Sequence, residues 1–292
     1  MAVKGTKKRE GDRYVTVSRT LWVDKLVLTI DLEECIGCEL CRKACPKEAI
    51  ALRKRPDRFA ESKFHGRRSI PLVDEDKCSM CGLCSAFCPT GAIQLAKKNS
   101  MQGTEEEIVP ILDVGGIPHF SKGMNLDTSL CPPGCSECAG ACPRNALSVE
   151  EGRIKLDRNR CLSCSHCEAA CPVPGAITVT PLFEGEIRVN TDKCPVGCDQ
   201  CVKACPTGCY VPMTSRGVTV DPRHCICCGA CLVACFYGAI DLTRLRLQAR
   251  DDGYSAVWSR AVDLLLSENA RFLRQSEGGL SRVTEMLKKS RL

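Results

Sequence analysis

The chain has 292 residues, of which 26 are cysteine and 4% are aromatic, and its formal net charge is +6. Its first residues are polar and basic without an apolar segment, and no apolar run approaches the roughly 18 residues of a membrane-spanning helix. This pattern argues against an exported, disulfide-rich protein and against a membrane span. We therefore expect a cytoplasmic protein, in a reducing compartment, whose thiolates bind metal.

The chain opens with a polar, charged stretch, residues 1–25, that ends in Leu21, Trp22 and Val23 and suggests a docking or covering segment. Residues 26–30 are rich in β-branched and aliphatic side chains and predict a short strand. That strand leads into a run in which three cysteines stand three residues apart and a fourth follows four residues later with proline behind it. The run consists of Cys35, Cys38, Cys41, Cys45 and Pro46.

Runs of this kind occur six times, each followed by a short helical turn and an apolar strand. Such self-similarity is the first feature to use in predicting a fold. The third and fifth runs share an extra residue, because both begin Cys-Pro-x-Gly-Cys and each opens a pair of runs. This predicts that the second and third pairs resemble each other more than they resemble the first. The six runs begin at Cys35, Cys78, Cys131, Cys161, Cys194 and Cys225.

Three thiolates in one tight loop with a fourth further on hold [4Fe–4S] clusters in bacterial ferredoxins, where the fourth cysteine of each run ligates the cluster of the other run. Applied to consecutive runs, this rule predicts six sites of four cysteines. The predicted sites are Cys35, Cys38, Cys41 and Cys88; Cys78, Cys81, Cys84 and Cys45; Cys131, Cys135, Cys138 and Cys171; Cys161, Cys164, Cys167 and Cys142; Cys194, Cys198, Cys201 and Cys235; Cys225, Cys228, Cys231 and Cys205.

Structural zinc is the alternative reading, but zinc sites pair two Cys-x-x-Cys motifs across a longer loop. Runs of four cysteines closed by proline fit that pattern less well, although the sixth run has Phe236 in place of the proline. Cys209 and Cys227 are left over, and inert buried thiols are the favoured interpretation over extra ligands. His166 and His224 stand beside cysteine ligands, where packing roles are favoured over tuning of a cluster.

The positive formal charge is misleading once clusters are included. An oxidised [4Fe–4S] cluster with four thiolates carries about −2. Six of them turn the formal +6 into about −6, so the lysine and arginine excess partly compensates the clusters, and a nucleic-acid partner is not expected. The cysteine runs divide the chain into units of roughly 65–80 residues, and units that small need disulfides or metals to be stable. We therefore expect the chain without iron to be largely unfolded.

The spacers between runs predict how the runs pair. From the last cysteine of one run to the first of the next there are 19 steps between the third and fourth and 20 between the fifth and sixth, but 43 between the second and third. The 33-step spacer inside the first pair holds a basic insert at 53–58, for which a solvated loop is favoured over a binding surface. The predicted fold is α+β: three tandem bacterial-type 2[4Fe–4S] ferredoxin domains with a C-terminal helical extension. Its predicted segments are an N-terminal extension 1–25, ferredoxin domains 26–98, 99–182 and 183–247, and a helical tail 248–292.

Residues 250–292 contain no cysteine and carry apolar residues at helical spacing. They predict helices that either cap the last ferredoxin domain or dock on a partner, and docking is slightly favoured. Elsewhere the chain shows no nucleophile–base constellation, no carboxylate pair in a recognisable site and no phosphate-binding glycine loop. The sequence therefore predicts a non-catalytic subunit.

With these residues laid out, the chain resembles the archaeal polyferredoxins, and in particular those of tungsten- or molybdenum-dependent formylmethanofuran dehydrogenase. The resemblance rests on the tandem runs, the Cys-Pro-x-Gly-Cys variant at 131–135 and 194–198, and the Gly-Ile-Pro-His-Phe sequence at 116–120. Members of that family typically carry eight runs, whereas this chain has six and a helical tail.

The resemblance implies an electron wire between a ferredoxin or heterodisulfide-reductase-type partner and the metal–pterin site of the CO2-reducing enzyme. Two alternatives stay open: the polyferredoxin of a hydrogenase, and a free electron shuttle without an obligate partner.

Overall fold

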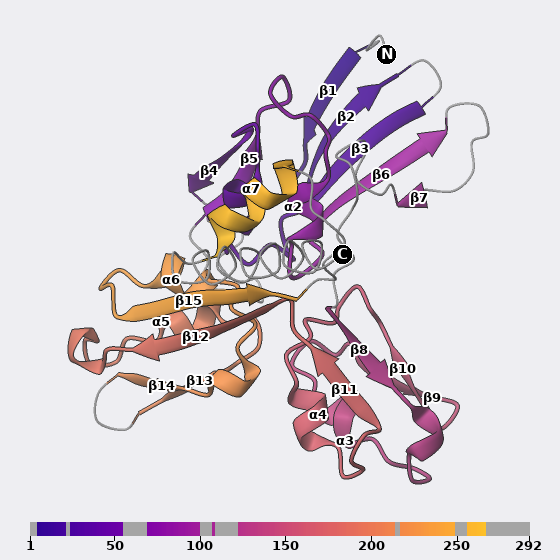
Figure 1. Cartoon of the computed structure of the whole chain (residues 1–292), viewed down its shortest axis with the longest axis vertical. Coiled ribbons are helices and arrows are strands. Elements are labelled where there is room, and N and C mark those ends of the chain that lie inside the picture. The colour runs from indigo at the N-terminus through magenta and orange to yellow at the C-terminus, as the bar shows by residue number, and fades with distance from the viewer. Residues whose placement is uncertain are drawn as a thin grey trace, which may run out of the picture.

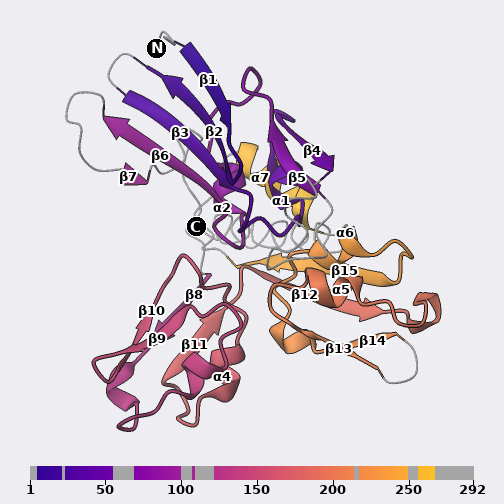
Figure 2. The same cartoon turned by 180° about the vertical axis from the view of Figure 1, so that it is seen from behind.

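The computed structural model describes residues 5–21, 24–54, 69–99, 107–108, 122–213, 217–248 and 256–266, and every structural statement below refers to these ranges. The described residues form three lobes that diverge from a common centre (Figures 1 and 2). Lobe 1 comprises the described residues between 5 and 108, lobe 2 residues 122–180 and lobe 3 residues 183–247. Within these ranges, no helix is both long and apolar enough to cross a membrane.

Lobe 1 is built on an antiparallel sheet with the strand order β1-β2-β3-β6-β7. Its strands are β1 (Gly5–Glu10), β2 (Tyr14–Thr20), β3 (Asp24–Asp31), β6 (Ile93–Asn99) and β7 (Glu107–Ile108). A second antiparallel pair and two short helices complete the lobe: β4 (Ile50–Lys54), β5 (Ser69–Val73), α1 (Leu40–Ala44) and α2 (Leu83–Ala86).

The N-terminal segment, expected to lie outside the first domain, instead adds two strands to its sheet. Val15 and Val17 alternate with polar residues, are buried, and face Ile30 and Leu28 across the ladder. This period of two is what a strand with one buried face shows. Arg13 fixes the register further, since its guanidinium donates to the Asp31 carboxylate at 2.8 Å.

Lobes 2 and 3 repeat one simpler plan. In lobe 2, β8 (Gly123–Leu126) pairs with β11 (Ile177–Thr180), and β9 (Leu147–Glu150) pairs with β10 (Arg153–Leu156). In lobe 3, β12 (Phe183–Val189) pairs with β15 (Ile240–Leu247), and β13 (Tyr210–Pro212) pairs with β14 (Val218–Val220). Short helices carry the third cysteine of each run: α3 (Glu137–Gly140), α4 (His166–Ala170), α5 (Gln200–Ala204) and α6 (Ala230–Ala234).

In all three lobes the strand before one cysteine run pairs with the strand after the next run, as β3 does with β6 and β12 with β15. This pairing groups the runs two by two and places both cysteine loops of a pair over the same sheet. A 3-10 turn ends directly before the third, fifth and sixth runs; these turns are η2 (Thr128–Leu130), η3 (Thr191–Lys193) and η4 (Pro222–His224).

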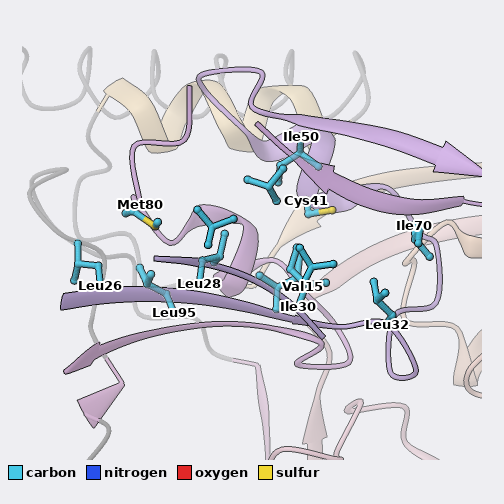
Figure 3. Packing of buried hydrophobic residues seen from close by; sticks show 13 residues of the cluster. Val15, Leu26, Leu28, Ile30, Leu32, Cys41, Ile50, Ile70, Met80 and Leu95 are labelled. Carbon is cyan, nitrogen blue, oxygen red and sulfur yellow. The ribbon is translucent and has the colours of Figure 1, made fainter. Parts of the chain in front are cut away.

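The cysteines are part of each lobe's core. In lobe 1, Leu28, Ile30 and Leu95 of the sheet face Cys41 and Ile50 from the segments above it (Figure 3). Because aromatic side chains are scarce, aliphatic residues and thiols fill the space between the sheet and the cysteine loops.

A further helix, α7 (Ala256–Leu265), lies between lobes 1 and 3 (Figure 1). Its Trp258 is fully buried and lies against Phe87 of lobe 1, in one apolar cluster with Phe183 and Leu247 of lobe 3. The slight preference for docking on a partner is therefore wrong for residues 256–266, because their apolar face is buried within the chain itself. The rest of the predicted tail lies outside the described residues, as do residues 55–58 of the basic insert.

Candidate metal centres

Each cysteine run bends at the same place. The residue before the second cysteine has a left-handed backbone with φ between 51° and 77° in all six runs, namely Gly37, Met80, Gly134, Ser163, Gly197 and Cys227. For a residue with a side chain this costs roughly 1–2 kcal/mol. A backbone kept in that conformation in six loops turns its N–H groups toward one side, as in anion-binding nests.

Backbone N–H groups also reach the cysteine sulfurs directly. Ala49, Ala146 and Ala239, each four residues after the last cysteine of a run, donate to Cys45, Cys142 and Cys235 at 3.3 Å. Hydrogen bonds to a cysteine sulfur stabilise thiolate and are one of the protein's means of setting the potential of an iron–sulfur cluster.

The structure brings the four cysteines of each predicted site together. At four sites the cysteines line a common hollow: site A (Cys35, Cys38, Cys41 and Cys88), site B (Cys45, Cys78, Cys81 and Cys84), site E (Cys194, Cys198, Cys201 and Cys235) and site F (Cys205, Cys225, Cys228 and Cys231). In each case the fourth cysteine comes from the other run of the pair.

In lobe 2, the cysteines of each of the two remaining sites also lie close to one another. Site C comprises Cys131, Cys135, Cys138 and Cys171, and site D comprises Cys142, Cys161, Cys164 and Cys167. At site C, burial and then the thiolates of Cys131 and Cys171 raise the pKa of Cys138. At site D, burial and then the thiolates of Cys164, Cys161 and Cys142 raise the pKa of Cys167 to about 12.

Burial combined with neighbouring thiolates raises the pKa of the inner cysteines throughout. At site A, burial and then Cys88 and Cys35 raise the pKa of Cys38 to about 12. Four thiolates held together in a part-buried hollow repel one another and need positive charge among them. The iron ions of a cluster would supply it.

These residues fit a cluster of several atoms rather than one ion. A zinc ion binds sulfur at about 2.3 Å and draws its four ligands to a point. Among the described residues, no three His, Cys, Asp or Glu side chains converge closely enough to hold a single metal ion. The thiols instead surround hollows, which is the arrangement a [4Fe–4S] cube requires.

Site F holds a fifth thiol that the sequence reasoning set aside. The Cys209 sulfur lies 3.4 Å from that of Cys205, lines the same hollow, and has a raised pKa because its S–H is shared with Cys205 and Cys225. The signal was available in the sequence. Cys209 stands four residues after the last cysteine of its run, where other runs have alanine, as at Ala49 and Ala239.

The other extra cysteine, Cys227, has a different environment. Its side chain is buried in the apolar cluster that also contains Trp258 and Phe183. Its S–H is nevertheless hydrogen-bonded to Cys225 of site F, and the S–H groups of Cys209 and Cys227 lower the pKa of Cys225 to about 3.

Sites A, D and F meet at the centre of the molecule. Ile36, Leu162 and Ile226, each the residue after the first cysteine of its run, pack together in one buried cluster. Cys228 of site F belongs to it, and Cys38 of site A and Cys164 of site D pack against it.

Polar contacts hold the lobes at this centre. His166 of lobe 2 and His224 of lobe 3 stack with ring centroids 3.7 Å apart, and Nδ1 of His224 lies 3.1 Å from the Cys164 carbonyl oxygen. Arg144 of lobe 2 pairs with Glu34 of lobe 1. The two histidines therefore join lobes.

Comparison with known families agrees with this geometry. The 4Fe-4S dicluster domain matches residues 34–106, 130–174 and 160–209, which together make up just over half of the chain. The chain belongs to this family: it is a polyferredoxin that carries multiple [4Fe–4S] dicluster ferredoxin domains. One of the matches, 160–209, spans the fourth and fifth runs, whereas the strand pairing joins the third with the fourth.

Curated relatives are electron-transport proteins and oxidoreductase subunits. Electron transport protein HydN of Escherichia coli is 30% identical over 105 residues, which are 30% of this chain and 60% of HydN. The chain thus spans less than two thirds of that relative. Putative electron transport protein YsaA of Escherichia coli is 33% identical over 120 residues, covering 37% of this chain and 76% of YsaA.

A solved structure matches almost the whole chain. It is a chain in the formate dehydrogenase–heterodisulfide reductase–formylmethanofuran dehydrogenase complex of Methanospirillum hungatei. The identity is 27%, the TM-score is 0.75, and the match covers 91% of this chain and 93% of that one.

Proposed function

We propose that the chain is a non-catalytic electron-transfer polyferredoxin that holds six [4Fe–4S] clusters, one at each of sites A to F, in three dicluster domains bounded at 26–98, 99–182 and 183–247. The observation that carries the proposal is the set of six four-thiol sites, each completed by a cysteine from the partner run. The clusters supply one-electron carriers when bound. The chain's own cysteines would hold them, and backbone N–H groups would donate to the cysteine sulfurs.

The meeting of sites A, D and F gives the proposed wire a branch point. Within each lobe the two sites share a core, and between lobes the contact runs through Ile36, Leu162 and Ile226. Clusters held by these cysteines would supply one-electron carriers in all three lobes around this contact. We infer a three-armed junction in place of a linear wire.

The parent assembly we propose is a formylmethanofuran dehydrogenase complex, with a ferredoxin or heterodisulfide reductase as the other electron partner. Support comes from the structural match, which covers 93% of a chain found in such an assembly. A chain of similar extent therefore occurs in that setting.

Two measurements on the chain purified with its native partners test the number of clusters and the parent complex. The first is iron and acid-labile sulfide analysis. About 24 iron ions per chain, four for each site, are expected. A value near 16 would mean that two of the sites are empty or are not clusters. Mass spectrometry of the co-purifying subunits should find a molybdopterin subunit. A nickel–iron subunit would instead identify the chain as the polyferredoxin of a hydrogenase. The absence of any stable partner would support a free electron shuttle.

A further inference from the structure

Arg244 is a buried cation at the contact between lobes 1 and 3. Its side chain is 7% exposed and projects from β15. Nε donates to the Cys227 carbonyl oxygen at 2.7 Å, and one terminal nitrogen donates to the Cys228 carbonyl oxygen at 2.9 Å. The guanidinium also lies over the Phe183 ring, 5.4 Å from its centroid. None of these partners is an acid, so the positive charge is not neutralised by a carboxylate among them.

The surrounding chain makes room for this guanidinium. A Cβ added at Gly229 would lie 2.8 Å from the nearest Arg244 nitrogen, and Gly229 has a φ of +86°. The equivalent position after the second cysteine is Glu39 in the first run and Ser165 in the fourth. A side chain fits there in other loops, so the glycine at this one leaves space for the arginine.

Arg244 lies beside two sites. Its hydrogen bond to the Cys228 carbonyl oxygen places it at site F, and Cys38 of site A packs against the buried cluster that contains Cys228. Site A and site F belong to different lobes, and Arg244 stands between them.

A second cation occupies the corresponding place between lobes 1 and 2. Lys122, the residue before β8, donates from Nζ to the Pro89 carbonyl oxygen of lobe 1 at 3.3 Å. Pro89 follows Cys88 of site A, and at the same contact Gly91 of lobe 1 lies against the Asn159 carbonyl oxygen of lobe 2, two residues before Cys161 of site D. Lys122 therefore lies where these two sites of different lobes approach each other.

We propose that Lys122 and Arg244 are positioning residues for electron transfer between lobes, each placing a positive charge between two clusters: Lys122 between sites A and D, and Arg244 between sites A and F. The inference rests on the proposed function. Two neighbouring clusters of about −2 each repel, and reduction makes the repulsion worse. A cation fixed between them stabilises the added electron on either cluster, because charge near a cluster is one determinant of its potential.

The pattern of potentials that follows is specific. Replacing Lys122 removes charge beside A and D and leaves F unchanged; replacing Arg244 removes charge beside A and F and leaves D unchanged. Site A is the one site that both cations face. Sites B, C and E should not move.

The test is a redox titration of the iron-loaded protein followed by electron paramagnetic resonance, on Lys122→Met, Arg244→Met and the double variant. Each single variant should shift two of the six midpoint potentials to more negative values. The double variant should shift three, one of them by the sum of its two single shifts. Lys122→Arg and Arg244→Lys keep the charge and should restore the wild-type potentials. Lys155→Met, which removes an exposed lysine of the same lobe as Lys122, should shift none.

Iron content separates the possible failures. If wild-type protein lacks the full iron complement, the proposed function fails. If the variants keep their iron and no potential moves, or if the charge-keeping variants shift as far as the methionine variants, the cation inference fails and the polyferredoxin assignment stands. Arg244→Met could lose iron because the carbonyl oxygens of Cys227 and Cys228 lose their donors. In that case the comparison of Lys122→Met with Lys122→Arg decides whether the cation inference holds.

Discussion

Trp258 of α7 lies against Phe87 of lobe 1, with ring centroids 5.3 Å apart. The two residues are far apart in sequence, and the same cluster includes Phe183 of lobe 3. The helix therefore fastens the first lobe to the third. Because sites A and F meet at that contact, packing by α7 fixes the distance between two candidate clusters.

Trp258→Ala should weaken the packing of α7 between lobes 1 and 3. Removing a fully buried tryptophan costs about 3–5 kcal/mol, from lost transfer free energy and the cavity left behind. We expect a lower thermal midpoint with iron still bound at low temperature, and slower electron transfer between lobes. Leu264→Ala is the matched control, since Leu264 is on the same helix but 49% exposed. Equal destabilisation by both variants would contradict the packing role of Trp258.

The thiol pair at site F yields a second prediction. Cys205→Ala removes a proposed ligand and should lose one cluster, about four iron ions per chain. Cys209→Ala should keep all six clusters, because the fifth thiol donates a hydrogen bond to its neighbours without completing the set. Losing that donor should shift one midpoint potential to a more negative value.

Iron analysis of the two variants, with the redox titration, checks this assignment. Cys227→Ala removes the other S–H that hydrogen-bonds Cys225, so it too should keep all six clusters and shift the same midpoint potential to a more negative value. If Cys209→Ala lost iron while Cys205→Ala kept it, the fourth ligand of site F would be Cys209.

Much of the local structure was predictable because it depends on residues close in sequence. Strands were expected at 26–30 and after each run, and the structure has β3 and the following strands there. The grouping of cysteines follows from strand pairing, which needs only the order of the runs; ligation itself stays a prediction. The alternation at Val15 and Val17 could have revealed β2, but the charged residues around it obscured the pattern.

Contacts between lobes were not predictable in this way. Ile36, Leu162 and Ile226 each look like an ordinary spacer residue within a cysteine run. They meet because the lobes pack, and packing over such separations has no local signal. The role of α7 was missed for the same reason, since an apolar helix face predicts burial without saying against what.

The lobes should respond unequally to loss of metal. Removing iron with a chelator under anaerobic conditions should unfold lobes 2 and 3, because their two-stranded sheets enclose small cores that depend on the cysteine loops. Lobe 1 has a larger sheet, in which Val15 and Val17 of β2 add buried apolar surface to the core that the sheet shares with the cysteine loops. We expect the backbone amides of its strands β1 to β3 to keep some protection from hydrogen exchange.

Hydrogen exchange followed by mass spectrometry measures this difference directly. Amides of β2 and β3 should exchange more slowly than those of β8 and β11 after iron removal. Reloading iron should restore protection in all three lobes. Uniform loss of protection would mean that the N-terminal strands have no stability of their own, and the whole chain would then fold only with its metal.

The ion pair between Arg144 and Glu34 offers the last prediction, because it joins lobes 1 and 2 beside sites A and D. The Arg144 side chain is 6% exposed and the Glu34 side chain 29% exposed. Removing one partner of a buried pair leaves the other charge uncompensated, and the cost is larger for the more buried group, up to about 3–5 kcal/mol. Glu34→Gln should therefore destabilise the protein more than Arg144→Met, since it strands the buried guanidinium. Chemical denaturation of both variants and of the double variant measures the coupling. If Arg144→Met proved the more harmful change, the arginine would contribute mainly through packing of its stem and not through the pair.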